Sequence, residues 1–573
     1  MDLPTLKYFA RFLKKYTWQE CVLVCLMFLT SVGTLVSPYV LKIIIDDVFP
    51  SRNYTLLLEV LLIYLIISIA RLVISYISTY MFESVSNHIM KDIRMSLFSH
   101  LIRLPLAFFD NSKAGDVIHR INSEVNSIQN MLTGSVIRLI NSLCTLIGLT
   151  IMLCILNYKL FLISLCVFPL IYVNTRYFQP RIHRNIKLSR LKDSDILSFL
   201  MERFANIKIL KSYVSYRHEE GKLDKEIDEQ IDINMRNVRL TSTTQNISMF
   251  MTALVPILIF CFGGRDVMAG VMTVGSLVAF IQYTNRLFDP MRDLMGLYFD
   301  TVRVSVSMDR VYEVMTLPQE PDAPGPGQSP GTVQGDIEFR NVSFGYDPAT
   351  PVLQHVNLTL RAGGKYALVG ASGCGKSTVV GLLCRLYEPQ QGTITVGGAD
   401  IGTMDLASWR QHINLVTQDN HLFHDTIGNN IRYGIGEVAP VEMERAARLS
   451  QMHDHISGMQ DGYDSMIGDR GVTLSGGQRQ RIAIARSMLR PAQIVLLDEA
   501  TSAVDSEAER VILQNVCEAN RGRTIIFVSH RFSAIRDVDR IICLDQGRIV
   551  EEGTHDELIR KRGYYWRLYK EQI

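Results

Sequence analysis

Residues 370–378 read Gly-Ala-Ser-Gly-Cys-Gly-Lys-Ser-Thr, between a short apolar run at 365–369 and a second apolar run that begins at Val379. This is the G-x-x-x-x-G-K-S pattern in the strand–loop–helix context of a phosphate-binding loop. Glycines let backbone N–H groups wrap around phosphate oxygens, and the N-terminus of the following helix adds its dipole. Lys376 is expected to neutralise β- and γ-phosphate charge, and Ser377 to bind Mg²⁺. The stretch predicts an α/β P-loop NTPase domain with these nucleotide contacts: Gly370, Ser372, Gly373, Cys374, Gly375, Lys376, Ser377 and Thr378.

Two further stretches of the same domain carry chemistry. Residues 494–499 read as a buried strand that ends in Asp498 and Glu499; one carboxylate suits the Mg²⁺ shell, and the next can polarise an attacking water. Residues 474–478 open an Arg-rich helix with a second phosphate-seeking N-terminus. One nucleotide does not need both helix N-termini from one chain, so a head-to-tail pair of domains is the economical arrangement. The candidate residues of the second stretch are Ser475, Gly476, Gly477 and Gln478.

The N-terminal half of the chain has a different composition. The whole chain of 573 residues is 47% hydrophobic and 20% charged, which is too apolar for a disordered or nucleic-acid-coating protein. Its net charge of +2 conceals a split. Residues 1–317 hold 33 Lys and Arg against 26 Asp and Glu, and the remainder holds 26 against 31. The long apolar runs lie almost entirely in the first part, so two kinds of domain are joined.

Six runs in the first part are apolar and long enough for membrane spans, which need about 20 residues in a helix. Basic residues concentrate before the first run, between the second and third, and between the fourth and fifth, where 14 lie from Arg176 to Arg239. By the positive-inside rule the N-terminus, both long connections and the C-terminal half face the cytoplasm. The two connections are expected to be helical, with turns near 108–115 and 211–217. The predicted spans are 18–45, 56–82, 131–156, 160–178, 241–262 and 273–299.

Polar residues inside the spans are costly and often functional. The cluster at 282–286, which includes Tyr283, is expected to line a translocation cavity, unless it lies at a solvated cytoplasmic end. The candidates are Arg71, Arg138, Asn141, Gln282, Asn285 and Arg286.

A proline- and glycine-rich stretch separates the halves, with five prolines between 318 and 330. No helix survives that density, so we expect a membrane domain at 1–317, a linker at 318–335 and a nucleotide-binding domain at 336–573. The ten cysteines form no C-x-x-C pair and are expected to be free thiols. Cys374 lies inside the phosphate loop, and two readings stay open: an innocuous small side chain, or a thiol through which a reagent blocks nucleotide binding.

The order of the motifs resembles the ATP-binding cassette family: the phosphate loop, Gln418, residues 474–478, Asp498-Glu499, Asp505 and His530. Six spans ahead of one cassette resemble an ABC exporter half-transporter with the type IV fold. The membrane half is similar mainly in layout, together with Ile-Ile-Asp-Asp at 44–47 and Gly-Val-Met-Thr-Val-Gly at 270–275.

The resemblance implies a role for each matching residue. Tyr346 would stack on adenine, and Gln418 would touch Mg²⁺ or the attacking water. Glu499 would be the general base, and His530 would hold the γ-phosphate. The implied ligands of Mg²⁺ are Ser377, Gln418 and Asp498.

Other matching residues imply a partner. Asp505 would cross to a second cassette, and the stretch at 468–471 would signal to the cytoplasmic loops. Because Glu499, His530 and the glycines after Ser475 are all present, a homodimer is favoured over a heterodimer, which stays possible.

Together these features predict an ATP hydrolase that exports an amphipathic small molecule, lipid or peptide by alternating access in a dimer. We expect a multi-pass protein of a bacterial inner or cell membrane, with its N-terminus and ATPase domain cytoplasmic and no nucleic-acid partner. Two alternatives stay open: an importer on the exporter fold, for example for a siderophore, and a membrane sensor that uses ATP without transport. A soluble cassette ATPase is a third reading, which the six spans oppose.

Overall fold

The computed structural model describes residues 3–112, 114–320, 335–347, 349–418, 420–468, 474–529 and 535–571. The chain divides into two compact units: Met1–Phe98 with His119–Met315, and Ser99–Ile118 with Thr316–Ile573. Part of the connection between the second and third predicted spans, residues 99–118, therefore belongs to the C-terminal unit, although it lies far from that unit in sequence. Most of the proposed linker, residues 321–334, lies outside the described residues, and the three-part division by residue number stays a prediction.

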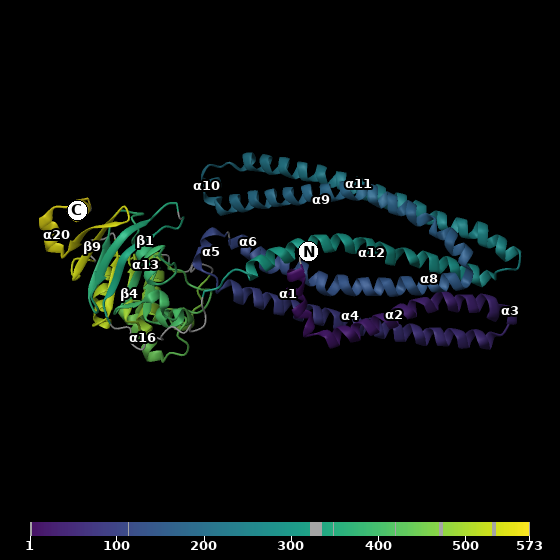
Figure 1. Cartoon of the computed structure of the whole chain (residues 1–573), viewed down its shortest axis with the longest axis horizontal. Helices are drawn as coiled ribbons and strands as arrows, with labels where there is room; N and C mark the ends of the chain where they lie inside the picture. Colours follow the sequence, from purple (N-terminus) through teal and green to yellow (C-terminus); the bar gives the residue numbers. More distant parts are fainter. Residues whose placement is uncertain are drawn as a thin grey trace. The chain divides into compact units, whose positions relative to one another are not determined.

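The first unit is helical throughout its described residues, and Figure 1 shows its long helices, with α9 and α11 side by side along much of their length. A buried apolar cluster joins α8, α9, α11 and α12. The described helices of this unit are α1 (Leu3–Lys14), α2 (Thr17–Ile43), α3 (Phe49–Ser51), α4 (Tyr54–Leu101, whose last turn reaches the other unit), α7 (Val125–Gln129), α8 (Val136–Leu165), α9 (Val167–Ala205), α10 (Ile207–Ser212), α11 (Tyr216–Met268) and α12 (Val274–Met315). Three π-helical segments lie among them, at Ile44–Val48, Arg120–Glu124 and Asn130–Ser135. The short helix α6 (Ala114–His119) belongs to the C-terminal unit up to Ile118.

Within the described ranges, four helical stretches are long and apolar enough to cross a membrane: Thr17–Ser51, Tyr54–Leu101, Arg120–Leu165 and Tyr216–Met268. The predicted third and fourth spans meet inside α8, at Asn157, whose backbone is extended (φ −165°, ψ 103°). The Asn157 side-chain oxygen accepts hydrogen bonds from the N–H groups of Lys159 and Leu160, so a new helix begins there. The predicted sixth span lies on α12. The first unit thus contains helices that could span a membrane, and the count of six spans stays a prediction.

A proline in α2 shapes the contact between the first and last predicted spans. Pro38 has no N–H, so the carbonyl of Thr34 lacks its usual donor within the helix. The guanidinium of Arg286 in α12 donates to that carbonyl, and the Tyr283 hydroxyl donates to the carbonyl of Leu35 at 2.5 Å. Tyr283 is completely buried. Two members of the polar cluster at 282–286 therefore serve a helix–helix contact, and its cavity role stays a prediction.

The two family-like stretches of the membrane half meet in the structure. Asp46, in the π-helical segment after α2, accepts hydrogen bonds from the Thr273 hydroxyl at 2.5 Å and from the Gly275 N–H at 2.8 Å. A Cβ on Gly275 would lie 2.6 Å from the Asp46 carboxylate, which explains the glycine. Asp46 thus caps the N-terminus of α12 across 229 residues of sequence.

The C-terminal unit contains two sheets. One has the antiparallel order β2-β1-β4-β5, and the other has the order β10-β9-β3-β8-β7-β6, in which every neighbouring pair except β10–β9 is parallel. The elements of this unit are α5 (Leu106–Asn111), β1 (Ile337–Phe344), β2 (Leu353–Leu360), β3 (Lys365–Val369), α13 (Lys376–Leu383), β4 (Gln391–Val396), β5 (Ala399–Asp400), α14 (Leu406–Gln411), β6 (Ile413–Val416), α15 (Ile427–Ile431), α16 (Pro440–Leu449), α17 (His453–Ser457), α18 (Gly476–Leu489), β7 (Ile494–Asp498), α19 (Ser506–Ala519), β8 (Thr524–Val528), β9 (Arg540–Asp545), β10 (Arg548–Gly553), α20 (His555–Lys561) and α21 (Tyr564–Lys570).

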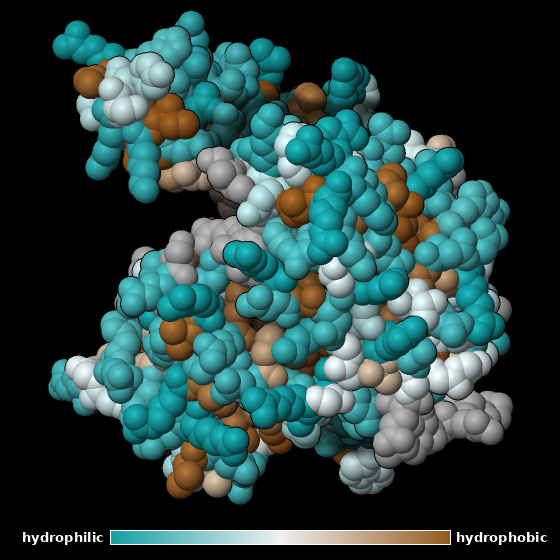
Figure 2. Space-filling view, turned by 90° about the vertical axis from the view of Figure 1, so that its left-hand side faces the viewer, coloured by the Kyte–Doolittle hydropathy of each residue, from teal (hydrophilic) through white to brown (hydrophobic). Residues whose placement is uncertain are grey.

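The central strands of the larger sheet are buried on both faces, which explains their continuous apolar sequence. One face packs with α13 and the smaller sheet, and the other with α18, α19, α20 and α21. Figure 2 shows the cassette end of the view in Figure 1; hydrophilic residues cover most of this surface, and hydrophobic ones are scattered over it. This surface suits a domain in water.

Candidate functional site

Four of the predicted motifs follow four adjacent parallel strands. The phosphate loop follows β3, Ser529 follows β8, Glu499 follows β7 and Thr417 follows β6. The register aligns these strand ends: Leu368 pairs with Val528, Val528 with Asp498, and Leu497 with Val416. Since neighbouring strands lie about 4.8 Å apart, the four loops share an edge roughly 14 Å wide. Ligands of open α/β sheets bind outside this carboxyl edge.

The phosphate loop is shaped around Lys376. This residue is only 6% exposed, and its ammonium group donates to the carbonyls of Gly370 and Ala371, at 2.9 Å each. Gly373 and Gly375 have positive φ of 78° and 107°, which side chains rarely adopt. A Cβ on Gly370 would lie 2.2 Å from the carbonyl oxygen of Leu544, so the loop lies directly against β9. The loop backbone and the start of α13 thus have the form of a phosphate cradle.

The side chains of the loop separate into an outer and an inner set. Ser372 and Ser377 are exposed, as is Gly373, whereas Thr378 is 4% exposed. The Cys374 side chain is 6% exposed and belongs to the apolar core, with its sulfur 3.8 Å from the Lys376 ammonium nitrogen. Any contact of Cys374 with nucleotide would therefore come from its backbone. This burial favours the innocuous reading of Cys374 over a reactive thiol.

The two carboxylates end β7 in different environments. Asp498 is 9% exposed, and Glu499 is half-buried with a left-handed φ of 48°. The Glu499 N–H donates to the carbonyl of Val528 at 2.9 Å, which ties this turn to β8. A left-handed residue other than glycine costs roughly 1–2 kcal/mol, and such strain gathers at functional sites. His530, the predicted γ-phosphate contact, lies outside the described residues.

The predicted metal ligands fit a hard cation. Ser377, Asp498 and Gln418 all offer oxygen, which Mg²⁺ prefers. Ser377 follows β3, Asp498 is the last residue of β7 and Gln418 follows β6, all at the shared edge. Gln418 is exposed. Among the described residues no three His, Cys, Asp or Glu side chains form a metal-binding group. Mg²⁺ usually takes one or two protein oxygens together with substrate phosphates, and a hydroxyl, a carboxylate and an amide oxygen fit that mode of binding.

The second helix N-terminus is built by a capping box. The Ser475 hydroxyl accepts from the N–H of Gln478 at 3.2 Å, and the Gln478 side chain accepts from the N–H of Ser475 at 2.7 Å. A Cβ on Gly477 would lie 2.8 Å from the carbonyl oxygen of Ala503. Glycine is thus required at 477 because the helix start lies against the turn after Glu499.

Sequence reasoning missed Gln480, which joins α18 to that turn. It is 4% exposed; its side-chain oxygen accepts from the Ala503 N–H, and its nitrogen donates to the Ser502 hydroxyl, both at 2.9 Å. The available signal was a glutamine on the otherwise apolar face of a helix, because a buried amide needs partners.

Asp505 makes local contacts in this chain. Its carboxylate accepts from the Ala508 N–H at 2.9 Å and so caps α19, and it forms an ion pair with Arg481 at 3.2 Å. The backbone hydrogen bond holds the pKa of Asp505 below its usual range. Its contact with a partner cassette stays a prediction. The stretch at 468–471 is described only at Gly468; residues 469–471 lie outside the described part.

Comparison with known proteins matches both halves of the chain. Residues 21–291 match the family model described as the ABC transporter transmembrane region, and residues 353–502 match the one described as ABC transporter. The ATP-dependent lipid A-core flippase of Syntrophus aciditrophicus is 33% identical over 554 residues, covering 96% of this chain and 91% of that protein. The leukotoxin translocation ATP-binding protein LktB of Mannheimia haemolytica is 32% identical, covering 95% and 77%.

A solved structure shares the whole architecture. The structure of a bacterial Atm1-family ABC exporter with ATP bound superposes with a TM-score of 0.83 at 28% identity, covering 97% of this chain and 98% of that chain. The chain therefore belongs to the ABC transporter family, among the exporters that carry a transmembrane region and one ATP-binding cassette in a single polypeptide. The predicted resemblance is confirmed: this is an integral membrane protein whose cassette binds ATP and couples its hydrolysis to translocation.

Proposed function

We propose that two copies of this chain form an exporter that moves an amphipathic small molecule, lipid or peptide by alternating access. The observation that carries the proposal is the shared edge of four adjacent strands, which gathers the phosphate loop, Glu499 and the Gln418 loop. The same cassette also holds the separate helix start at Ser475. The relatives named as a lipid A-core flippase and a leukotoxin translocation protein support a bulky, amphipathic cargo.

A chain with both phosphate-binding elements supplies two equivalent sites when two copies pair head to tail. In each site, phosphates would lie between the loop around Lys376 and the partner's helix start. Closing the pair around ATP would then move the membrane helices through α5 and the turn near 211–217. The basic residues of the two long connections support an orientation in which both cassettes would lie on the inner side of a bacterial inner or cell membrane.

The chemistry follows from groups already in place. Lys376 would exchange its two loop carbonyls for phosphate oxygens, which carry full charge and therefore bind the ammonium more strongly. Mg²⁺ would be held by Ser377, Asp498 and Gln418, and it would neutralise part of the phosphate charge. Glu499 would accept the proton of the attacking water, and His530 would orient the γ-phosphate.

Replacing the proposed base tests this assignment. In reconstituted full-length protein, Glu499→Gln is expected to bind ATP, accumulate a closed dimer and lose turnover by about 10²–10⁴-fold, the usual worth of a general base. Glu507→Gln is the matched control, because Glu507 is an exposed acid in the first turn of α19. Near-normal turnover of Glu499→Gln would refute the assignment.

The direction of transport is tested separately, in inside-out membrane vesicles. A screen for compounds that stimulate the ATPase in nanodiscs first supplies a labelled cargo. Export predicts ATP-dependent accumulation of that cargo inside these vesicles. Depletion from preloaded vesicles would show an importer, and ATP turnover without any cargo movement would favour the sensor.

A further inference from the structure

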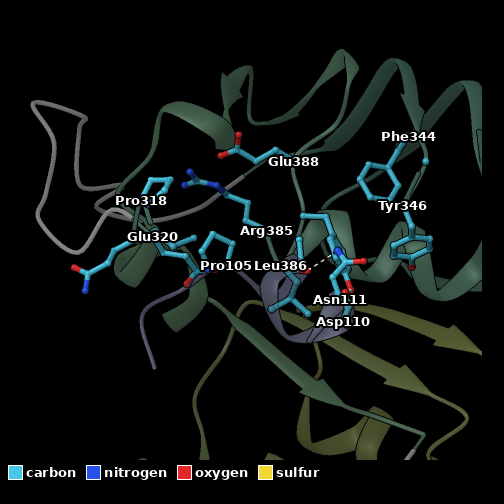
Figure 3. Close-up of a pocket in the computed structure, with 15 residues that line it drawn as sticks. Pro105, Asp110, Asn111, Pro318, Glu320, Phe344, Tyr346, Arg385, Leu386 and Glu388 are labelled. Carbon is cyan, nitrogen blue, oxygen red and sulfur yellow. Dashed lines mark hydrogen bonds between the residues drawn. The ribbon is translucent and has the colours of Figure 1, made fainter. Parts of the chain in front are cut away.

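Three aromatic rings gather around the proposed adenine-stacking residue. The rings of Tyr346 and Tyr387 meet edge to face, with centroids 5.2 Å apart and planes at 87°. Phe344 contacts both, at 5.2 Å from Tyr346 and 5.5 Å from Tyr387. Figure 3 shows Phe344 and Tyr346 together on the β1 side of a cavity. Edge-to-face pairs have a preferred geometry, so these rings fix one another's orientation.

The backbone after α13 determines where Tyr387 lies. The helix ends in a Schellman turn: the N–H of Arg385 donates to the carbonyl of Leu382, and that of Leu386 to the carbonyl of Gly381. Arg385 takes the left-handed position with φ 50°, and its buried guanidinium donates to the carbonyls of Met404 and Gly402. A Cβ on Gly381 would lie 3.2 Å from the Tyr387 ring, so this helical glycine gives the ring its space.

The hydroxyl of Tyr387 connects this cluster to α5. It donates to a carboxylate oxygen of Asp110 at 2.7 Å. Asp110 lies on α5, the short helix in the connection between the second and third predicted spans. Burial, and then the hydrogen bond to the Asp110 carboxylate, raise the pKa of Tyr387. The phenol therefore stays protonated and remains a donor at neutral pH. Hydrogen bonds to a carboxylate are the stronger kind.

The hydroxyl of Tyr346 contacts the first turn of α13, the helix that follows the phosphate loop. It lies 3.1 Å from the hydroxyl of Thr378, which is 4% exposed in the first turn of α13, next to Ser377. Contacts thus run without a gap from Asp110 through Tyr387 and Tyr346 to Thr378. These contacts therefore join α5 to the first turn of α13, the helix that follows the phosphate loop.

A cavity of about 430 Å³ lies beside these contacts. Its walls come from α5, from Phe344–Tyr346 at the end of β1 and from the turn at 385–388, and Figure 3 shows α5 and Tyr346 on its borders. Tyr346 is 54% exposed, so dense packing does not hold its ring on every side. The rings of Phe344 and Tyr387 and the Thr378 hydroxyl are the contacts that orient it, and Tyr387 is the one that also reaches α5.

We propose that Tyr387 is a positioning residue for ATP binding: it orients Tyr346 for adenine and ties that orientation to α5. This inference rests on the proposed function, in which Tyr346 stacks on adenine and α5 moves with the spans. Movement of α5 then changes ATP affinity, and ATP binding changes the position of α5 by the same free energy, because coupling between sites is reciprocal.

The test removes one hydroxyl and keeps the ring. In full-length protein in nanodiscs, Tyr387→Phe is expected to raise the KM for ATP about 3- to 10-fold, the worth of one hydrogen bond, with kcat changed less than about twofold. Tripolyphosphate, which lacks adenine, is expected to inhibit the variant as strongly as the parent. Tyr463→Phe is the matched control: its hydroxyl also has a partner, His453 at 2.9 Å, but lies outside these contacts, and its KM is expected to stay unchanged.

A double-mutant cycle isolates the link to α5. Asp110→Ala is expected to raise the KM as much as Tyr387→Phe does, and the double variant is expected to show no further rise. An unchanged KM in both single variants overturns the inference, as does an equal loss of tripolyphosphate affinity, which would show a distorted loop instead. Absence of cargo transport by the parent would count against the proposed function, while the KM shifts would still decide this inference.

Discussion

Replacing Gly477 with alanine is expected to destabilise the cassette through one identifiable clash. The new Cβ would lie 2.8 Å from the carbonyl oxygen of Ala503, about 0.6 Å inside the 3.4 Å at which ordinary contact begins. The turn cannot retreat freely, because Gln480 of the same helix holds the N–H of Ala503 and the hydroxyl of Ser502. Either α18 shifts or these buried hydrogen bonds stretch.

The neighbouring glycine supplies the matched control. A Cβ on Gly476 would lie 3.4 Å from the Cβ of Ala503, which is ordinary contact. Alanine is a better helix former than glycine by up to about 1 kcal/mol, and both positions gain this term. Overpacking costs about 1–3 kcal/mol, and only Gly477→Ala incurs it. Gly477→Ala is therefore expected to be about 2 kcal/mol less stable than Gly476→Ala.

Thermal unfolding of the two full-length variants measures this difference. For a domain of this size, about 2 kcal/mol corresponds to a separation of roughly 4–8 °C between unfolding midpoints. The ATPase of Gly477→Ala is also expected to fall about tenfold, because Gln480 contacts the turn that carries Glu499. Equal midpoints, or a higher midpoint for Gly477→Ala, would refute the reasoning.

Two further predictions follow from buried contacts. Arg286→Ala leaves the Thr34 carbonyl without a donor and is expected to lower the free energy of unfolding by about 1–3 kcal/mol in the parent. In a Pro38→Ala background, where residue 38 regains its N–H, the same change is expected to cost far less. Thermal unfolding in detergent compares the variants, and equal losses of stability in both backgrounds would contradict this. Cys374 is expected to resist a maleimide in the folded protein because its side chain is 6% exposed. Mass spectrometry of labelled protein, with a denatured sample as control, checks this, and rapid native labelling with loss of ATP binding would restore the reactive-thiol reading.

Much of the candidate site could be predicted from local sequence. The phosphate loop needs consecutive N–H groups and a helix start, so its requirements lie within nine neighbouring residues. The capping box at Ser475 and the acids after a buried strand are local for the same reason. Gln480 and Tyr387 carry no such signature, because each acts through residues that adjoin it only after the chain folds. The predicted cavity role of 282–286 did not foresee that Arg286 and Tyr283 would meet the backbone at Pro38.

The sequence by itself determined the two kinds of domain, the apolar spans, and the chemistry that each nucleotide motif can perform, because these depend on composition and on spacing along the chain. Tertiary structure alone decided that four motif loops share one sheet edge, since strand order is not written in any single strand. It also decided that Asp46 caps α12, and that Tyr387 stands between Asp110 and Tyr346. Such contacts arise from packing between segments distant in sequence, where shape and unpaired hydrogen-bonding groups select the partner.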